Sequence, residues 1–139
     1  MSAFTRKQGF IANGVGAASV AIVLDATDAK NDGSSATFTA ADTVTIPVPV
    51  GFVCVAANVV TNKAWTGTLD IGKTGSTAAI GSATDPSETV GEAINCAAAD
   101  TTPVQFLTAA TANIVVTVNS TNATGKVTIY VHGFYAKAY

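Results

Sequence analysis

Charged side chains are scarce in this sequence: Asp, Glu, Lys and Arg make up 12% of the 139 residues, about half the proportion that is usual in soluble domains. The seven Lys and Arg residues nearly balance the nine Asp and Glu residues, so there is no electrostatic reason to expect a nucleic-acid partner. Ala, Thr, Ser, Gly and Asn take the place of the missing charges. A surface of this kind is easily desolvated, which suits a subunit of an assembly better than a free monomer.

Histidine and cysteine are too few for most metal and catalytic sites. His132 is the single histidine. This excludes a metal site with two histidine ligands, and it means that a Ser-His-Asp triad could be built only around His132. We expect His132 at an exposed or interface position, opposite the apolar face of its strand. Cys54 and Cys96 could form one disulfide at most. Because Cys54 lies in the most apolar stretch, we expect it to be a reduced core residue.

No stretch of the sequence is long and apolar enough to span a membrane. Arg6 and Lys7 precede an uncharged stretch, residues 8–24, that loosely imitates a secretory signal. Glycine and polar residues interrupt this stretch, so we expect neither a targeting segment nor a transmembrane helix. A membrane partner is therefore not expected.

The pattern that is present throughout is alternation of apolar and polar residues, which is typical of β-strands. In residues 44–50 the apolar side chains alternate with polar residues and with Pro47 and Pro49. Prolines cannot donate to a neighbouring strand, so this strand is expected at a sheet edge. Residues 52–60 form a nearly continuous apolar run, which predicts a strand buried on both faces. A third strand is expected over residues 65–71, with Trp65 buried at its start.

The rest of the chain also predicts short strands and no helix. Residues 72–92 lack a clear period and are expected to be a long loop. The last two alternating runs flank an Asn/Thr/Gly turn and predict a β-hairpin. Phe38 could begin a further short strand. The other expected strands are 20–24, 93–96, 104–107, 114–118 and 127–134. Seven or eight short strands predict an all-β fold, a single-domain β-sandwich or jelly-roll over residues 17–139, preceded by an extended N-terminal arm over residues 1–16.

Two motifs invite functional interpretations that the surrounding residues do not support. Residues 67–74 match the phosphate-binding P-loop pattern, but they alternate like a strand, Asp70 would repel phosphate and no helix is expected to follow. We interpret them as a strand that runs into a Gly-Lys-Thr-Gly turn. Asp25, Asp28 and Asp32 could attract calcium, yet the distal bidentate glutamate of an EF-hand is missing. We interpret them as a solvated loop, and we expect no metal and no cofactor.

Four segments carry a recognisable pattern: 46–51 (IPVPVG), 61–67 (TNKAWTG), 69–75 (LDIGKTG) and 123–131 (ATGKVTIYV). Together they resemble small β-rich virion structural proteins of tailed bacteriophages, in particular head decoration or cement proteins. The resemblance covers residues 36–75 and 104–133.

The resemblance implies a non-enzymatic protein, without catalytic residues, that binds and stabilises the capsid shell. Its implied partners are the major capsid protein and copies of itself in a trimer or dimer. Its implied place is the exterior of the virion, after synthesis in the host cytoplasm. Two alternatives stay open: a tail or fibre-base structural protein, and a host-adsorption or carbohydrate-binding β-module that would use the aromatic tail, Phe134, Tyr135 and Tyr139.

Interface residues are expected mainly in the N-terminal arm. Residues 1–16 contain three glycines and little periodicity, and yet they carry large apolar side chains. We expect another chain to order this arm, with aromatic anchors in partner pockets and basic residues that set its orientation. Aromatic residues at the C-terminus are expected to add subunit contacts. The candidate interface residues are Phe4, Arg6, Lys7, Phe10, Ile11, Tyr135 and Tyr139.

Overall fold

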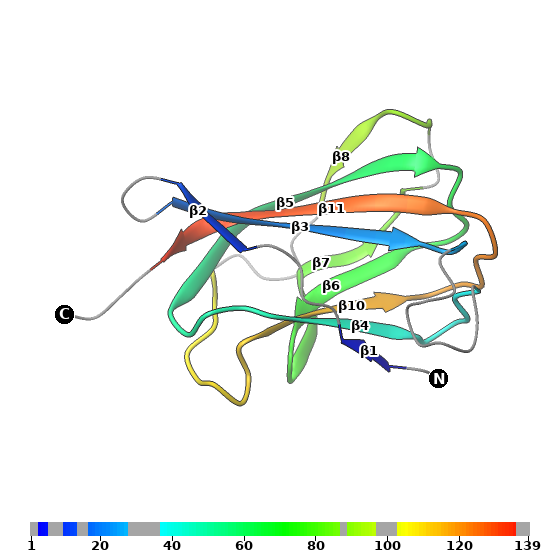
Figure 1. Cartoon of the computed structure of the whole chain (residues 1–139). Helices are drawn as coiled ribbons and strands as arrows, with labels where there is room; N and C mark the ends of the chain where they lie inside the picture. Colours follow the sequence, from blue (N-terminus) through cyan, green and yellow to red (C-terminus); the bar gives the residue numbers. More distant parts are fainter. Residues whose placement is uncertain are drawn as a thin grey trace.

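In the computed structural model the described residues are 3–5, 10–13, 17–27, 37–86, 89–96 and 103–135. They form eleven strands in two layers that pack face to face (Figure 1). The strands are β1 (Ala3–Thr5), β2 (Phe10–Asn13), β3 (Ala17–Asp25), β4 (Thr43–Pro47), β5 (Phe52–Lys63), β6 (Leu69–Lys73), β7 (Ser76–Thr84), β8 (Ala93–Asn95), β9 (Val104–Gln105), β10 (Asn113–Val118) and β11 (Lys126–Tyr135). The all-β sandwich expected from the sequence is confirmed.

The two layers have different strand orders. Sheet A has the order β1-β4-β10-β6-β7, and sheet B has the order β2-β3-β11-β5-β8, with β9 also paired to β5. All neighbours are antiparallel except β1 and β4, which are parallel. The long pairings of β11 with β3 and β5 form the centre of sheet B.

The core lies between the sheets and follows the alternation seen in the sequence. In β10 and β11 the inward residues are fully buried, for example Ile114, Val116 and Ile129. The largest fully buried side chains are Phe38, Phe52, Phe106, Ile22, Leu24, Ile46, Leu69, Ile71, Ile114 and Ile129. Each such aliphatic or aromatic side chain stabilises the fold by about 1.5–3 kcal/mol through its removal from water.

Pro47 and Pro49 lie beyond the part of β4 that pairs with β1, its neighbour at the edge of sheet A. β1 pairs only with Thr43 to Thr45, whereas Pro47 is the last residue of β4 and pairs with Asn113 of β10. Neither Pro47 nor Pro49 therefore has to donate to β1. The expectation of an edge holds for this end of β4, but the start of the strand lies between β1 and β10.

Strand β5 is not buried on both faces, as its apolar run had suggested. Burial alternates from Ala57 to Thr61, because only one face of sheet B packs on sheet A. Val55 is 55% exposed and lies between the paired residues Cys54 and Ala56, where the register with β11 shifts. The extra residue of a β-bulge has no partner on the neighbouring strand, and this removes Val55 from the alternation.

Trp65 is buried, as predicted, but it does not begin a strand. It lies in the connection between β5 and β6, only 3% exposed. Its ring lies 6.0 Å from that of Phe38, between ring centroids, and β6 begins later, at Leu69. Phe38 itself forms an isolated bridge to Asn122.

Two predictions about connections were wrong. The last two strands do not form a hairpin, because β10 pairs with β4 and β6 in sheet A while β11 pairs with β3 and β5 in sheet B. The expected loop over residues 72–92 contains the nine-residue strand β7. Backbone hydrogen bonds to β6 do not require large side chains, so this stretch of Ala, Gly, Ser and Thr forms a strand without an apolar period.

Residues 3–5 and 10–13 of the expected N-terminal arm are edge strands of the chain's own sheets. β1 adds to β4 in sheet A, and β2 adds to β3 in sheet B. These strands contain Phe4, Phe10 and Ile11. A second chain is therefore not needed to explain their extended backbone, while the division into arm and domain stays a prediction. Arg6, Lys7 and Tyr139 lie outside the described residues.

Candidate interface at one end of the sandwich

The P-loop match is a strand, as the sequence interpretation expected. Residues 69–73 form β6 and lead into a turn in which Gly75 has a φ of 86°. The carboxylate of Asp70 accepts a hydrogen bond from the Ala83 N–H (2.7 Å), and Lys73 Nζ donates to the Gln105 carbonyl (2.9 Å). Both charged side chains of the motif therefore hold neighbouring segments of this chain.

Asp25, the described member of the acidic loop, closes a local turn. Its Oδ1 accepts hydrogen bonds from the Thr27 N–H (3.0 Å) and hydroxyl (2.7 Å), and Lys126 Nζ lies 4.0 Å from its other oxygen. The hydrogen bonds from Thr27, and then the nearby lysines, hold the pKa of Asp25 below its usual value of 3.8. Asp28 and Asp32 lie outside the described residues. In the described part of the chain, no three His, Cys, Asp or Glu side chains gather as metal ligands would.

His132 is exposed on the outer face of sheet B, in agreement with the prediction. Its Nε2 lies 3.3 Å from Asn58 Oδ1. The rings of His132 and Tyr130 are nearly parallel, 6° apart, with 6.4 Å between their centroids. Neither contact joins the imidazole to a nucleophile. Together they place His132 in a row of surface side chains with Tyr130 and Asn58.

The two cysteines are free thiols in the structure. Cys54 is buried, as predicted, and Cys96 is half-buried. Burial raises the pKa of the Cys54 thiol to about 11. Since the thiolate is the reactive form, this environment makes Cys54 a poor nucleophile. Among the described residues there is also no helix, and hence no helical membrane span.

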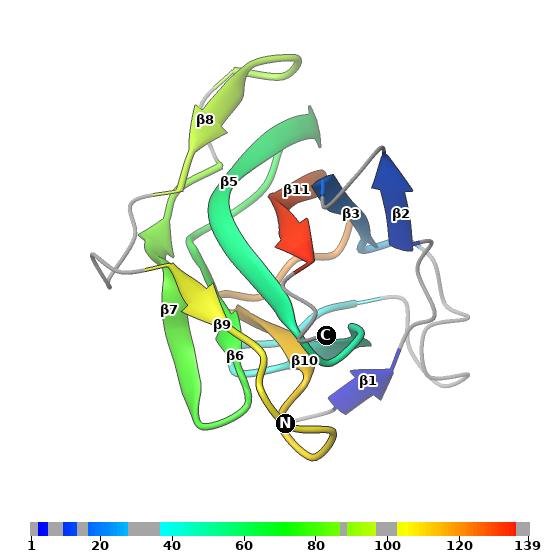
Figure 2. The same ribbon diagram turned by 90° about the vertical axis from the view of Figure 1, so that its left-hand side faces the viewer.

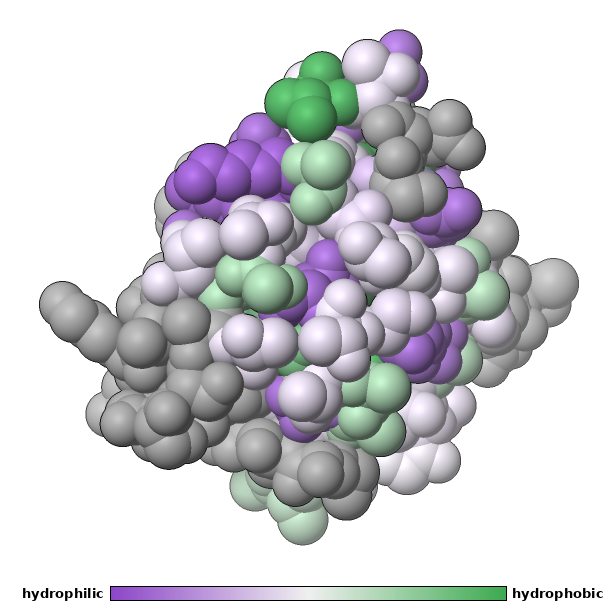
Figure 3. Space-filling view, turned by 90° about the vertical axis from the view of Figure 1, so that its right-hand side faces the viewer, coloured by the Kyte–Doolittle hydropathy of each residue, from purple (hydrophilic) through white to green (hydrophobic). Residues whose placement is uncertain are grey.

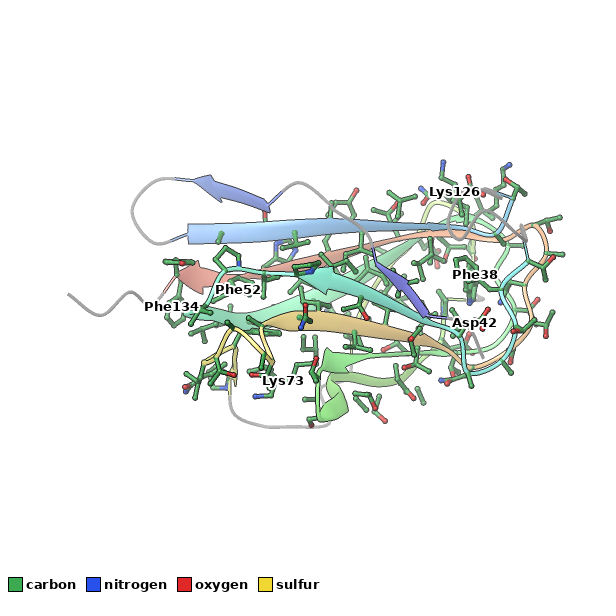
Figure 4. The ribbon with its side chains drawn as sticks, turned by 60° about the horizontal axis from the view of Figure 1, so that its bottom comes forward. Phe38, Asp42, Phe52, Lys73, Lys126 and Phe134 are labelled. Atoms are coloured by element: carbon green, nitrogen blue, oxygen red, sulfur yellow. The ribbon has the colours of Figure 1, made fainter. Side chains whose placement is uncertain are left out.

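Charged residues gather at one end of the sandwich, which we call the charged end. Of the eight charged residues that the structure describes, five acidic and two basic residues lie at strand ends or in connections on this side. Figure 4 shows Asp42 and Lys126 there, far from Lys73 and Phe134 at the opposite end. The seven residues are Asp25, Asp42, Lys63, Asp70, Asp85, Glu92 and Lys126.

The surface of the charged end is polar to neutral. Figure 3 views this end, and its coloured part shows mainly hydrophilic and weakly polar side chains, with small, separated hydrophobic spots. The charged side chains at this end are costly to remove from water, so it has the character of a solvent-facing end.

The opposite end, which we call the charge-poor end, consists of residues 48–51, 73–76, 103–112 and 133–135 (Figure 2). Lys73 is the single charged residue in these four segments. Three large hydrophobic side chains are exposed here: Val50 at 44%, Leu107 at 65% and Phe134 at 42%. Depletion of charge together with exposed apolar and aromatic side chains is typical of the centre of a protein interface.

Buried neighbours hold Leu107 and Val50 in place. Phe106, which precedes Leu107, is fully buried and stacks on Phe52 with 5.6 Å between ring centroids. The Gly51 N–H donates to the Phe106 carbonyl (2.8 Å), and the Phe106 N–H donates to the Phe52 carbonyl (3.0 Å). These bonds join the β4–β5 turn to the 103–112 connection, so the two exposed side chains project from one hydrogen-bonded unit.

Phe134 is held by the close approach of β11 to β5. It pairs with Val53, and Tyr135 pairs with Phe52. At Gly133 a Cβ atom would lie 1.9 Å from the Val53 carbonyl oxygen, so the two strands approach this closely only with glycine at this position. Tyr135, the described C-terminal member of the predicted interface residues, is half-buried at this end.

A cleft of 260 Å³ borders the charge-poor end between the β6–β7 turn and β9. Lys73, Ser76, Ala79, Gln105 and Leu107 are among the residues that line it. The ammonium group of Lys73 has three donors and uses one on the Gln105 carbonyl. It can therefore also donate to acceptors on a bound partner.

Sequence reasoning missed Val50 and Leu107 as surface residues. Val50 belongs to the same alternating series as the buried Ile46 and Val48, and this placed it on the inner face. It is exposed because β4 ends at Pro47 and the chain turns at Gly51, which has a φ of 97°. The Pro-Val-Gly sequence was the signal for that turn.

Comparison with known proteins shows a similarity of fold and no similarity to a known family. No protein-family model and no curated protein matches this chain. Among solved structures it is similar to a chain of the cyanophage Pam1 capsid asymmetric unit, with a TM-score of 0.56 and 18% sequence identity. The match covers 94% of this chain and 93% of that chain. The two chains therefore share their fold over nearly their whole lengths.

Proposed function

We propose that this protein is a non-enzymatic structural component of a phage virion that binds the capsid shell and stabilises it. The observation that carries this proposal is the fold similarity to a chain of a cyanophage capsid asymmetric unit, which covers 94% and 93% of the two chains. Because the match is not confined to part of either chain, the comparison concerns the whole β-sandwich. The sequence resemblance to head decoration proteins supports the same class of function.

The physical mechanism of such a protein is binding linkage. A protein that binds the assembled shell, and not its separated subunits, stabilises the shell by RT ln(1 + L/Kd) at each site, where L is the concentration of free protein. Icosahedral shells repeat each site many times, so a modest contribution from each copy becomes a large total. The scarcity of charge, 12% of residues, supports this role because such surfaces are cheaply desolvated on binding.

The proposed partners are the major capsid protein and copies of this chain, in a trimer or dimer on the exterior of the virion. Residues 3–5 and 10–13 supply edge strands to the two sheets, and short edge strands with unpaired outer backbone groups can extend a sheet into a neighbouring subunit. We therefore keep Phe4, Phe10 and Ile11 as proposed contacts between copies. Arg6, Lys7 and Tyr139 are proposed contacts as well.

The stoichiometry of purified virions tests this function. Quantitative mass spectrometry of particles from the source virus should find this chain in a fixed ratio to the major capsid protein, at many copies per particle. Cryo-electron microscopy should then place it on the shell. A few copies per particle would point to the tail or fibre base instead, and absence from purified particles would refute a virion role.

A glycan-binding module is the second candidate, and the side-chain row on the outer face of sheet B favours it. Tyr130 is 38% exposed and nearly parallel to the ring of His132, which in turn contacts the amide of Asn58. Sugars stack on aromatic rings and bond to amides. Tyr130→Ala should abolish retention on a host-polysaccharide column if this candidate is right, and wild-type protein that is not retained would exclude it.

A further inference from the structure

We propose that the charge-poor end is the surface that docks on the capsid shell, against an apolar patch of the shell that presents oxygen acceptors to Lys73. This inference rests on the proposed function and adds to it the orientation of the molecule and the chemistry of the contact. It places the charged end outward, away from the shell.

The two ends of the sandwich differ in the number of charged side chains that a docking partner would remove from water. Contact through the charged end would remove water from as many as six charged side chains, four acidic and two basic, because the seventh, Asp42, is already buried. Each buried charge without a partner is strongly unfavourable. Contact through the described part of the charge-poor end desolvates one charge, that of Lys73, whose ammonium group already has one hydrogen bond. Desolvation therefore favours the charge-poor end.

The apolar side chains at this end are suited to serve as anchors. Leu107 is the most exposed large hydrophobic residue in the described part of the chain, at 65%, and Val50 and Phe134 are each more than 40% exposed. Val50 and Leu107 are next to Gly51 and Phe106, whose backbone groups are hydrogen-bonded to each other and to Phe52. Phe134 lies in β11 and pairs with Val53 of β5. Anchors held in this way lose little conformational entropy on binding, so more of their burial contributes to affinity.

The charge of Lys73 favours the shell over a second copy of this chain as the occupant. In a two-fold contact the same patch comes from both copies, so two lysines would enter one interface. The described segments of the charge-poor end hold no carboxylate to compensate them. A different protein can supply carbonyl or carboxylate oxygens at the 260 Å³ cleft, which Lys73 lines.

The test compares two matched substitutions in binding to shells assembled from the major capsid protein of the same virus. Leu107→Asp introduces a charge at the proposed docking surface. Val90→Asp introduces the same charge at another exposed aliphatic residue (54% exposed), in the connection between β7 and β8. Because both side chains are exposed, both variants should keep the thermal midpoint of the wild type within a few degrees, which is checked first by circular dichroism.

Co-sedimentation with shells should show that Leu107→Asp weakens binding by about 30-fold or more, the range of an interface hot spot. Val90→Asp should change binding by less than about twofold. If wild-type protein does not bind shells at all, the proposed function fails and the docking surface fails with it. If wild type and Leu107→Asp bind equally well, the function stands and the docking surface is wrong.

Light scattering in the absence of shells tests the alternative occupant. We expect the same oligomeric state for wild type and Leu107→Asp. A wild-type oligomer that Leu107→Asp dissociates would show that a second copy covers this end, and it would overturn the inference even if the protein binds shells.

Discussion

Replacing Asn122 by aspartate should destabilise the fold strongly, although the two side chains have nearly the same size. Asn122 is 3% exposed and lies in the connection that crosses from β10 in sheet A to β11 in sheet B. Its Nδ2 donates to the carbonyls of Thr66 (2.9 Å) and Ser120 (3.2 Å), and its Oδ1 accepts from the Thr66 N–H (2.7 Å). Backbone hydrogen bonds with Phe38 complete the site.

The magnitude follows from the two donated hydrogen bonds. Asn122→Asp keeps the acceptor for the Thr66 N–H but replaces the donor by a second oxygen, which then faces the two carbonyl groups. The two lost hydrogen bonds are part-buried and contribute about 0.5–1.5 kcal/mol each. The new oxygen at this 3%-exposed position is itself buried without a donor, which costs about 1–3 kcal/mol more, so the total is about 2–6 kcal/mol. This is a large part of the total stability of a typical domain, about 5–15 kcal/mol.

The loss should depend on pH, because the new carboxyl group can donate only when it is protonated. Burial and the two carbonyl oxygens favour its neutral form, so its pKa in the folded state lies above the value in the unfolded chain, about 3.9. A group with a raised pKa is best tolerated below the unfolded pKa, and its penalty grows as the pH rises through the folded pKa. The variant should therefore be closer to wild type at pH 4 than at pH 7.

Urea unfolding at both pH values measures this effect, with Asn119→Asp as the matched control. Asn119 is exposed, and its Nδ2 donates to one hydroxyl, Thr68 Oγ1, at 2.9 Å. Water can replace that bond, so we expect a change below about 1 kcal/mol. Equal losses for the two variants, or a loss at Asn122 that is the same at pH 4 and pH 7, would refute the role given to this side chain.

Four further predictions follow from the same structure. Trp65→Ala should lower the free energy of unfolding in urea by about 3–5 kcal/mol. Native tryptophan emission should be blue-shifted because Trp65 is buried. A red-shifted and easily quenched emission would mean that Trp65 faces solvent. Lys73→Ala should change stability by less than about 1 kcal/mol, and ATP binding by the wild type that this variant loses would contradict the strand assignment of the P-loop match. Burial raises the pKa of Cys54 to about 11, so the stability given by its neutral thiol is complete below pH 9.0 and is lost as the pH rises toward 11. At pH 8 the Cys54 thiol should react with a disulfide reagent only after unfolding. Rapid reaction of Cys54 in the native state would contradict its burial. Deletion of residues 1–12 should leave a folded sandwich with a modestly lower thermal midpoint, because two short edge strands are lost. The same deletion should abolish self-association or shell binding. Full decoration of shells by this variant would exclude the arm as a tether.

Local patterning was enough to predict the fold class and most of the core. The alternation in β3, β10 and β11 depends on the geometry of a pleated strand, in which neighbouring side chains point to opposite faces. Any sheet that buries one face must therefore bury the same set, whatever its neighbours are. The burial of Trp65 was predictable for a related reason, since a large aromatic ring among apolar residues has few favourable positions outside the core.

Tertiary structure alone decided which strands pair. β10 and β11 have the pattern of a hairpin, but their backbone groups are satisfied by strands distant in the sequence. Local residues do not specify this choice, because every strand presents the same donors and acceptors. β7 was missed because its stability comes from hydrogen bonds to β6 and not from a period of large side chains.

The two ends of the sandwich are also products of the tertiary structure. The composition showed that charge was scarce, but not that seven of the eight described charges would lie at one end. Val50 and Phe134 are 84 residues apart in the sequence, with Leu107 between them. The three lie at one end because the β4–β5 turn is hydrogen-bonded to Phe106, and because the end of β11 pairs with the start of β5. A surface built in this way leaves no pattern in any short stretch of residues, and only the pairing of the strands brings it together.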